Sequence, residues 1–251
     1  MNKLIFGFAF LLLSVTNLSA QFPSQNTMIS AQGNFSQYLN RTIVKNSTAI
    51  QQSAVINSFN NEENTIGARF LFNEWVEGDS IVNAEGVQIN TVGFIFNYDK
   101  MTGSLLATQD KINNMLVAST GIQSFVLRGM GKRYLFQHVK TIDSAHFFLN
   151  LIKTDDKYSL YKRFQTHFVP ANLRNDGIIQ TGNAYNEYKD DNEYYVVDET
   201  VNAASKLNFK AKTIKQIFAV QKDKVNTYFK QRDNDEINEK FLIGLVAYLN
   251  Q

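Results

Sequence analysis

Hydrophobic and polar residues alternate in short runs along most of the chain, and the period of this pattern changes twice. From Ile66 onward, short apolar and aromatic runs are separated by polar turns rich in Gly, Asp and Asn. This pattern is typical of short antiparallel strands joined by hairpins. The predicted strands span 66–77, 80–83, 87–98, 104–108, 114–118, 123–128, 133–140, 145–153, 158–168, 183–189 and 194–197.

So many consecutive strands predict a mainly β chain. We expect an antiparallel meander that either curls into a barrel or folds into a two-layer sandwich, because an open sheet leaves exposed edges. The β-rich domain is predicted to span 65–199.

Near the C-terminus the period changes to that of helices, which we predict at 201–207, 213–220, 223–231 and 235–249. In the last of these, apolar residues recur on one face. They are Ile237, Phe241, Leu242, Leu245, Tyr248 and Leu249. Residues 200–251 are therefore expected to form a helical tail packed on the β-domain. Lysines lie on or between the predicted outer faces, where they either contact an acidic surface or are simply solvated.

The first twenty residues have the layout of a secretory signal peptide. Lys3 precedes an apolar stretch from Leu4 to Val15, and a short polar segment ends at Ala20, after which we expect cleavage. The alternative is an N-terminal anchor or a buried helix. The mature chain is predicted to lack a transmembrane segment, and we expect it in the periplasm or outside the cell.

Residues 21–64 form a polar N-terminal arm rich in Asn, Gln and Ser. Phe35, Tyr38, Leu39 and Ile43 fall at helical spacing. Two interpretations stay open, an amphipathic helix and a loosely ordered arm.

Composition narrows the classes of function. The 251 residues are 44% hydrophobic, which suits one packed domain with or without a small appendage. The net charge of +2 is too balanced to predict a nucleic-acid partner. The chain has no Cys, so disulfides, thiolate metal sites and a cysteine nucleophile are excluded. No cofactor is predicted.

No motif in the chain predicts catalysis. His138, His146 and His167 lack the spacing of metal ligands and are interpreted as strand or turn residues with satisfied hydrogen bonds. The run Asp143-Ser144-Ala145-His146 contains the residue types of a catalytic triad, but a turn between strands explains it more simply. A pair of carboxylates acting in hydrolysis stays open, because their separation in space decides it. No residue is assigned as catalytic.

The aromatic residues of the first predicted strands allow two interpretations. They line a cavity for a small apolar ligand, as in a lipocalin-like barrel, or they fill the core. The candidate ligand-lining residues are Phe72, Trp75, Phe94, Phe96 and Tyr98.

A family resemblance adds to this picture. Its first part consists of Phe72, Trp75, Val76, Gly78, Gly86 and the run Phe96-Asn97-Tyr98-Asp99. Its second part consists of Glu187-Tyr188, Tyr194-Tyr195-Val196-Val197, Thr227-Tyr228-Phe229-Lys230 and Ala247-Tyr248-Leu249-Asn250. The chain resembles a group of exported bacterial proteins of unassigned function that have a β-rich body and a helical C-terminal tail. The resemblance implies export and architecture, and no catalytic residue.

Two short segments are similar to the acceptor pattern of a bacterial O-glycosylation system. They are Asp79-Ser80-Ile81 and Asp143-Ser144-Ala145, which makes Ser80 and Ser144 candidate glycan acceptors.

Three functions remain open at this point. The first is a non-enzymatic, envelope-associated protein that binds or scaffolds another envelope protein. The second is a lipocalin-like carrier of a small apolar ligand. The third is a carboxylate-based hydrolase.

Overall fold

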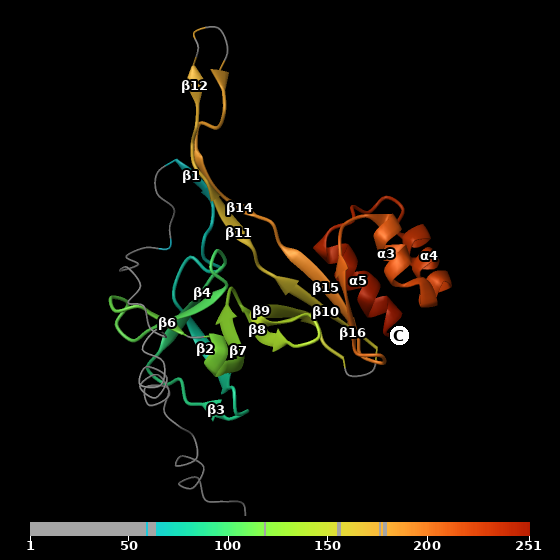
Figure 1. Ribbon diagram of the computed structural model, residues 1–251, viewed down its shortest axis with the longest axis horizontal. Helices are drawn as coiled ribbons and strands as arrows, with labels where there is room; N and C mark the ends of the chain where they lie inside the picture. Colours follow the sequence, from blue (N-terminus) through green and yellow to red (C-terminus); the bar gives the residue numbers. More distant parts are fainter. Residues whose placement is uncertain (1–58, 60–63, 118, 155–156, 176, 178–179) are drawn as a thin grey trace, which may run out of the picture. The chain divides into compact units, whose positions relative to one another are not determined.

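The computed structural model describes residues 59, 64–117, 119–154, 157–175, 177 and 180–251. These residues belong to one compact unit. The predicted signal peptide lies outside the described residues, as does the predicted polar arm apart from Phe59 and Asn64. Within the described part, short strands are followed by C-terminal helices (Figure 1), so the prediction of a mainly β chain with C-terminal helices is confirmed.

The strands of the described residues form a large sheet, a small one and a short hairpin. Their bounds are β1 Thr65–Gly67, β2 Val76–Asn83, β3 Gln88–Ile89, β4 Ile95–Asp99, β5 Ser104–Thr108, β6 Met115–Val117, β7 Ile122–Gly129, β8 Lys132–Val139, β9 Asp143–Ile152, β10 Tyr158–Arg163, β11 Thr166–Val169, β12 Arg174–Asn175, β13 Gln180–Thr181, β14 Asn186–Asp190, β15 Glu193–Asp198 and β16 Ala203–Leu207. The helices are α3 Ala211–Ile217, α4 Lys222–Gln231 and α5 Glu239–Leu249, with the short 3₁₀ turns η1 Ser119–Gly121 and η2 Ala219–Gln221.

The large sheet is antiparallel and has the strand order β16-β15-β10-β9-β8-β7-β2-β4-β5-β6, with β3 paired to β2. It curls into a half-barrel that stays open (Figure 1), which is the barrel-like form of the predicted meander. Aromatic rings fill the curl. Tyr98 stacks on Phe136 with ring centroids 4.5 Å apart, and Phe136 stacks on Phe125 at 4.8 Å. All three are almost fully buried.

Four of the predicted elements are wrong in type or extent. The segment 201–207, predicted as a helix, contains strand β16, which pairs with β15 over its full length. The single strand predicted at 66–77 is two strands, β1 and β2, separated by a bend. The strands predicted at 87–98 and 158–168 are likewise each divided in two.

A buried asparagine explains why the bend at 68–75 is stable. The Asn97 side chain of β4 is fully buried, donates to the carbonyls of Phe72 (2.9 Å) and Glu74 (3.1 Å), and accepts from the Phe72 amide (3.2 Å). It therefore replaces the strand partner that the bent backbone lacks, because buried backbone groups need hydrogen-bond partners.

The three α-helices pack together against one end of the sheet and form what we call the helical lobe (residues 211–250). α5 contacts β9 and β10, and α3 contacts β16. The Asn250 side chain accepts from the Tyr158 amide (3.0 Å) and donates to its carbonyl (2.9 Å), so the end of α5 is fixed to β10.

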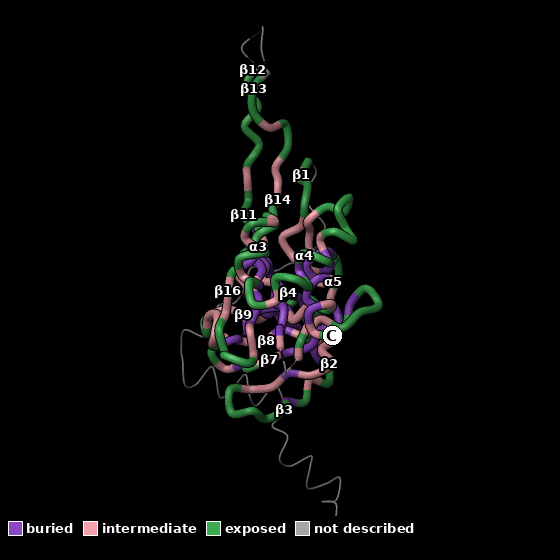
Figure 2. Tube along the Cα trace, turned by 90° about the vertical axis from the view of Figure 1, so that its right-hand side faces the viewer, coloured by how far each residue is buried: buried purple, intermediate pink, exposed green. Residues whose placement is uncertain are grey.

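A second projection, which we call the ribbon, consists of residues 65–67 and 166–190. The chain leaves the large sheet after β10 and returns into it at β15, and between them β11 and β14 pair with each other. β1 adds to β14 in parallel, and β12 and β13 form the tip. Figure 2 shows the ribbon as a row of exposed and half-buried residues, in contrast to the buried interior of the sheet.

Candidate functional site

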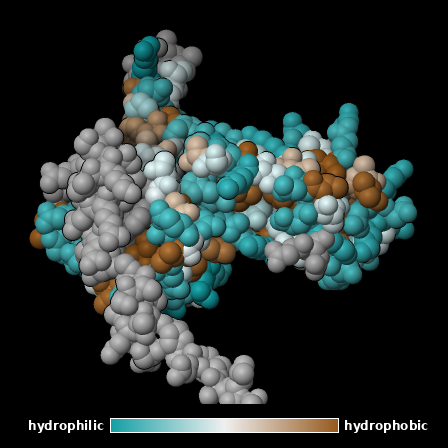
Figure 3. Space-filling view, turned by 60° about the horizontal axis from the view of Figure 1, so that its bottom comes forward, coloured by the Kyte–Doolittle hydropathy of each residue, from teal (hydrophilic) through white to brown (hydrophobic). Residues whose placement is uncertain are grey.

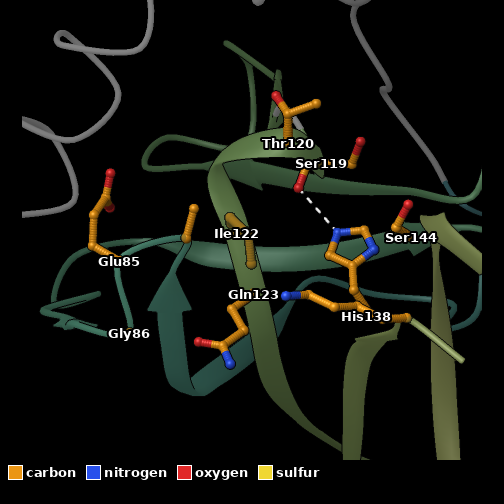
Figure 4. A pocket seen from close by; sticks show the side chains of 10 residues that line it. Glu85, Gly86, Ser119, Thr120, Ile122, Gln123, His138 and Ser144 are labelled. Carbon is orange, nitrogen blue, oxygen red and sulfur yellow. Dashed lines mark hydrogen bonds between the residues drawn. The ribbon is translucent and has the colours of Figure 1, made fainter.

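A pocket of about 400 Å³ opens at one end of the curled sheet (Figure 4). It is bounded by the turn between β2 and β3, by η1 with the start of β7, and by the neighbouring ends of β8 and β9. Its lining is Ala84, Glu85, Gly86, Ser119, Thr120, Ile122, Gln123, His138, Lys140 and Ser144. This size is within the usual range for small-molecule sites, and the polar lining differs from the aromatic cavity expected for an apolar carrier.

His138 lines this pocket, and both of its ring nitrogens lie within hydrogen-bond distance of backbone carbonyls. Nδ1 lies 2.9 Å from the carbonyl oxygen of His146, and Nε2 lies 3.1 Å from that of Ser119. The ring also packs on Phe147, with centroids 4.1 Å apart. Both ring nitrogens thus lie against backbone carbonyls rather than a hydroxyl, and the ring links η1 to β9.

The run Asp143-Ser144-Ala145-His146 forms the start of β9 and does not form a catalytic triad. The Asp143 carboxylate accepts from the Ala145 amide at 2.7 Å and pairs with His146 Nδ1. These hydrogen bonds hold the pKa of Asp143 below its ordinary value. Ser144 is exposed and lines the large pocket, whereas His146 lines a different pocket of about 120 Å³. The contact between nucleophile and base that such catalysis needs is therefore not made here.

Most of the candidate ligand-lining aromatics lie in the core. Phe72, Phe94, Phe96 and Tyr98 are at most 7% exposed, and they belong to one apolar cluster inside the curl. Trp75 is half-buried and meets Phe59 edge-on at 4.9 Å. None of the five lines the large pocket, and Tyr98 alone lines the small one.

Two glycines make room for these rings. A Cβ on Gly78 would overlap the ring of Phe96, and a Cβ on Gly129 would overlap that of Phe72. The rings therefore lie directly on the backbone of β2 and β7, as core residues do in curled sheets.

The candidate glycan acceptors lie on two different strands. Ser80 is half-buried in β2, beside Asp79, whose carboxylate pairs with Arg128 (2.6 Å) and Arg133 (2.7 Å). Ser144 is exposed at the start of β9. Their modification stays a prediction. Among the residues that the structure describes, no group of three or more His, Asp or Glu side chains is placed to hold a metal ion.

The ribbon was not predicted as a projection: strands were predicted at 158–168 and 183–189, but not β12 or β13, nor the departure of β11 and β14 from the sheet. Large apolar side chains are 42–48% exposed along it, namely Ile66, Phe168, Leu173 and Tyr185. Phe168 on β11 lies opposite Tyr188 on β14, with ring centroids 5.1 Å apart. Within the described residues, β11 pairs with β14 alone and leaves its other edge open.

The base of the ribbon is held by polar contacts. Lys100, which is 7% exposed, donates to both carboxylate oxygens of Asp190, at 2.8 and 3.0 Å. The Thr166 hydroxyl donates to the same carboxylate at 2.5 Å. Close by, Arg69 pairs with the buried Asp99 at 2.6 Å. In the sequence, Lys100 directly follows the run Phe96–Asp99, but the sequence alone does not show that its ammonium contacts Asp190.

Comparison with known proteins adds no identification. A scan against protein-family models, a search of curated proteins and a search of solved structures each found no match. Of the helices in the described part of the chain, none is both long enough and apolar enough to cross a membrane.

Proposed function

We propose that this chain is an exported, non-enzymatic binding or scaffolding protein of the cell envelope, and that it holds a macromolecular partner through the ribbon. The observation that carries the proposal is the combination of exposed apolar side chains and an open strand edge in the ribbon. Phe168 and Tyr185 are 43% and 42% exposed on a structure with no core of its own.

The chemistry of such a ribbon suits protein recognition. An open edge offers backbone donors and acceptors to an incoming strand, and neighbouring apolar side chains supply contact area. Aromatic residues are enriched among the residues that contribute most to binding at protein interfaces. We therefore expect the partner to present an extended segment with apolar side chains.

Two further points support the rest of the proposal. The first twenty residues have the pattern of a signal peptide, and the resemblance to exported bacterial proteins agrees with that pattern. The absence of a nucleophile–base contact between Ser144 and His146 or His138 favours binding over hydrolysis.

Site-specific photo-crosslinking in the expressing cells tests the proposal. A photoreactive amino acid is placed at Phe168 or at Tyr185 of the full chain. The matched control carries it at Val92, which is 82% exposed in the turn between β3 and β4 and lies outside the ribbon. We expect a discrete high-mass adduct from both ribbon positions and none from Val92.

The proposal fails if the three positions give the same adducts, or if the ribbon positions give none.

Native and denatured masses of the purified chain separate the proposal from the carrier alternative. An extra mass seen only under native conditions, together with absent ribbon adducts, would favour a bound small ligand.

A further inference from the structure

Charge is distributed unevenly along the described chain. Between Ala203 and Arg232 there are eight basic residues and one acidic residue, a net charge of +7, whereas the whole chain carries +2. The rest of the chain, with 17 basic and 22 acidic residues, therefore carries −5. The positive charge is concentrated on one strand and two helices at a single end of the sheet.

Most of this charge is not neutralised locally. Lys206 pairs with Glu193 and Arg232 pairs with Asp235. The six other lysines are all exposed, and within the described residues none of them makes an ion pair. We call them the basic face, and they are Lys210, Lys212, Lys215, Lys222, Lys224 and Lys230.

An apolar side chain lies within the basic face. Val220, in the turn η2 between α3 and α4, is 95% exposed, the highest value among the exposed large apolar residues of the described chain. Lys222 and Lys224 follow it two and four positions later, and Lys215 lies five positions before it. Phe209, 43% exposed, precedes α3. The visible side of the lobe in Figure 3 is mostly hydrophilic and carries a smaller hydrophobic patch.

We propose that the basic face of α3 and α4 docks the protein on an anionic phospholipid surface, with Val220 entering the interfacial layer. Several lysines close to an anionic bilayer each contribute about 1 kcal/mol of attraction, which corresponds to about fivefold in binding. The exposed apolar side chain of Val220 contributes favourably to binding only where it leaves water, as it does at the level of the lipid headgroups.

The apolar apex also distinguishes a membrane from the other anionic partners. A single-stranded nucleic acid needs aromatic rings on which bases stack. Val220 offers none, and the ring of Phe209 already packs on Tyr194, with centroids 5.0 Å apart. The ribbon strands β1, β14 and β11 form a separate small sheet, whereas α3 contacts β16 of the large sheet. Docking through α3 and α4 therefore uses a different surface from the ribbon. The inference therefore goes beyond the proposed function and does not depend on it.

Co-sedimentation of the full chain with lipid vesicles tests the inference. Vesicles of phosphatidylcholine containing about a third phosphatidylglycerol are compared with pure phosphatidylcholine at about 0.1 M salt. The test variant is Lys212→Gln/Lys215→Gln/Lys222→Gln/Lys224→Gln. The control loses the same charge elsewhere through Lys111→Gln/Lys132→Gln/Lys140→Gln/Lys153→Gln, four lysines that are also exposed. Residues 1–58 are identical in both variants, so any contribution they make to vesicle binding cancels in the comparison.

We expect the test variant to bind the anionic vesicles about 100-fold or more weakly than the wild type, and the control to lose much less. Val220→Ser should weaken binding about threefold to tenfold without a change in charge. Substitution of Phe168 and Tyr185 by Ser should leave vesicle binding unchanged, so failure here and failure of the ribbon as a partner site are distinguishable.

Equal losses in the two four-lysine variants would overturn the inference, as would equal binding to neutral and anionic vesicles. Failure of the wild type to sediment with either vesicle would also overturn it. So would displacement from anionic vesicles by a short single-stranded oligonucleotide at equal charge concentration, since the basic face would then prefer nucleic acid. Circular dichroism verifies that each variant is folded.

Discussion

The ribbon and the helical lobe both extend from the same curled sheet, yet they are stabilised in different ways. Among the described side chains of the ribbon, only Thr166 is buried, and it lies at the base. The lobe buries a whole set of apolar side chains, namely Ile214, Phe218, Val225, Tyr228, Phe241, Leu242, Leu245, Val246 and Leu249. The lobe is therefore held by apolar burial, and the ribbon by backbone pairing and a few polar contacts.

This difference in apolar burial indicates which part of the chain opens more easily. An isolated pair of strands is only marginally stable in water, and elements with few buried contacts open locally at low free-energy cost. A ribbon with exposed Phe168 and Tyr185 therefore gains little stability from apolar burial. The lobe shares one apolar cluster with β10, β15 and β16, and its outer face carries exposed lysines.

The largest effect is expected inside the lobe. Leu245 of α5 is fully buried, so Leu245→Ala removes apolar contacts and leaves a cavity. The free energy of unfolding should fall by about 2–5 kcal/mol, measured by urea titration. Phe168→Ala, the ribbon counterpart, should cost less than about 1 kcal/mol. Equal costs would show that the ribbon has a core of its own, contrary to the comparison.

The next effect is expected at the base of the ribbon. Asp190→Ala leaves the Lys100 ammonium, which is 7% exposed, without its carboxylate. We expect a loss of about 2 kcal/mol, less than for a fully buried pair because Asp190 is partly exposed. Limited proteolysis should show faster cleavage within the ribbon.

A double variant checks that this loss comes from the unpaired charge. Lys100→Met removes the ammonium while keeping the length of the side chain, so adding it to Asp190→Ala should recover part of the stability. If the double variant is less stable than Asp190→Ala, the ion pair does not explain the effect.

An effect of similar size is expected where β1 joins the ribbon. Gly67 has φ +76°, and a Cβ there would overlap the backbone carbonyl of Tyr188. Gly67→Ala should cost about 2 kcal/mol and detach β1 from β14. Hydrogen exchange at the Asn186 amide, which donates to the Asn64 carbonyl, should become faster. Gly131→Ala is the matched control, because its φ is +70° but no atom lies near the added Cβ.

The smallest effect concerns the pH dependence of the lobe. Burial opposes ionisation of Glu239, but hydrogen bonds from Lys162 and the Tyr194 hydroxyl, both at 2.7 Å, outweigh it. The pKa of Glu239 consequently lies below its ordinary value of 4.5. A carboxylate with a lowered folded pKa stabilises the protein above the unfolded value, and this contribution is lost as the pH falls through the folded value.

Urea titrations across pH should therefore show wild type more stable than Glu239→Gln above pH 4.5, with the difference narrowing at lower pH. The same comparison in a Lys162→Gln background should be flatter, since a main partner is gone. A difference that does not change with pH would mean that Glu239 does not titrate as proposed.

Much of the fold could be predicted from patterns that are local in the sequence. The apolar stripe from Ile237 to Leu249 predicts α5, because helix periodicity and burial coincide there. The segment 201–207 was wrongly predicted as a helix because Ala203, Ala204 and Leu207 favour helices on their own. Pairing with β15 decides its structure, as tertiary context commonly does.

The candidate sites were harder to predict, because they depend on contacts between distant residues. Lys100 and Asp190 are 90 positions apart, and nothing in the local sequence couples them. Asn97 was noticed as part of a motif, but its role at the bend becomes visible only when Phe72 is placed beside it. The lysines of the lobe were visible in the sequence, whereas the fold determines that none of the basic-face lysines forms an ion pair with a described residue.

The strand register of the ribbon determines how the length of this projection can change. Its two legs keep a single register from the pair Tyr158–Asp198 in the large sheet out to the pair Val169–Glu187. If two residues were removed from each leg, the remaining residues of the two legs would still pair in register and point to the same sides of the ribbon, because side chains alternate with a period of two. Each such step would bring the tip about 7 Å closer to the sheet. The reach of the ribbon is thus a variable that insertions and deletions can adjust while the sheet beneath it stays the same.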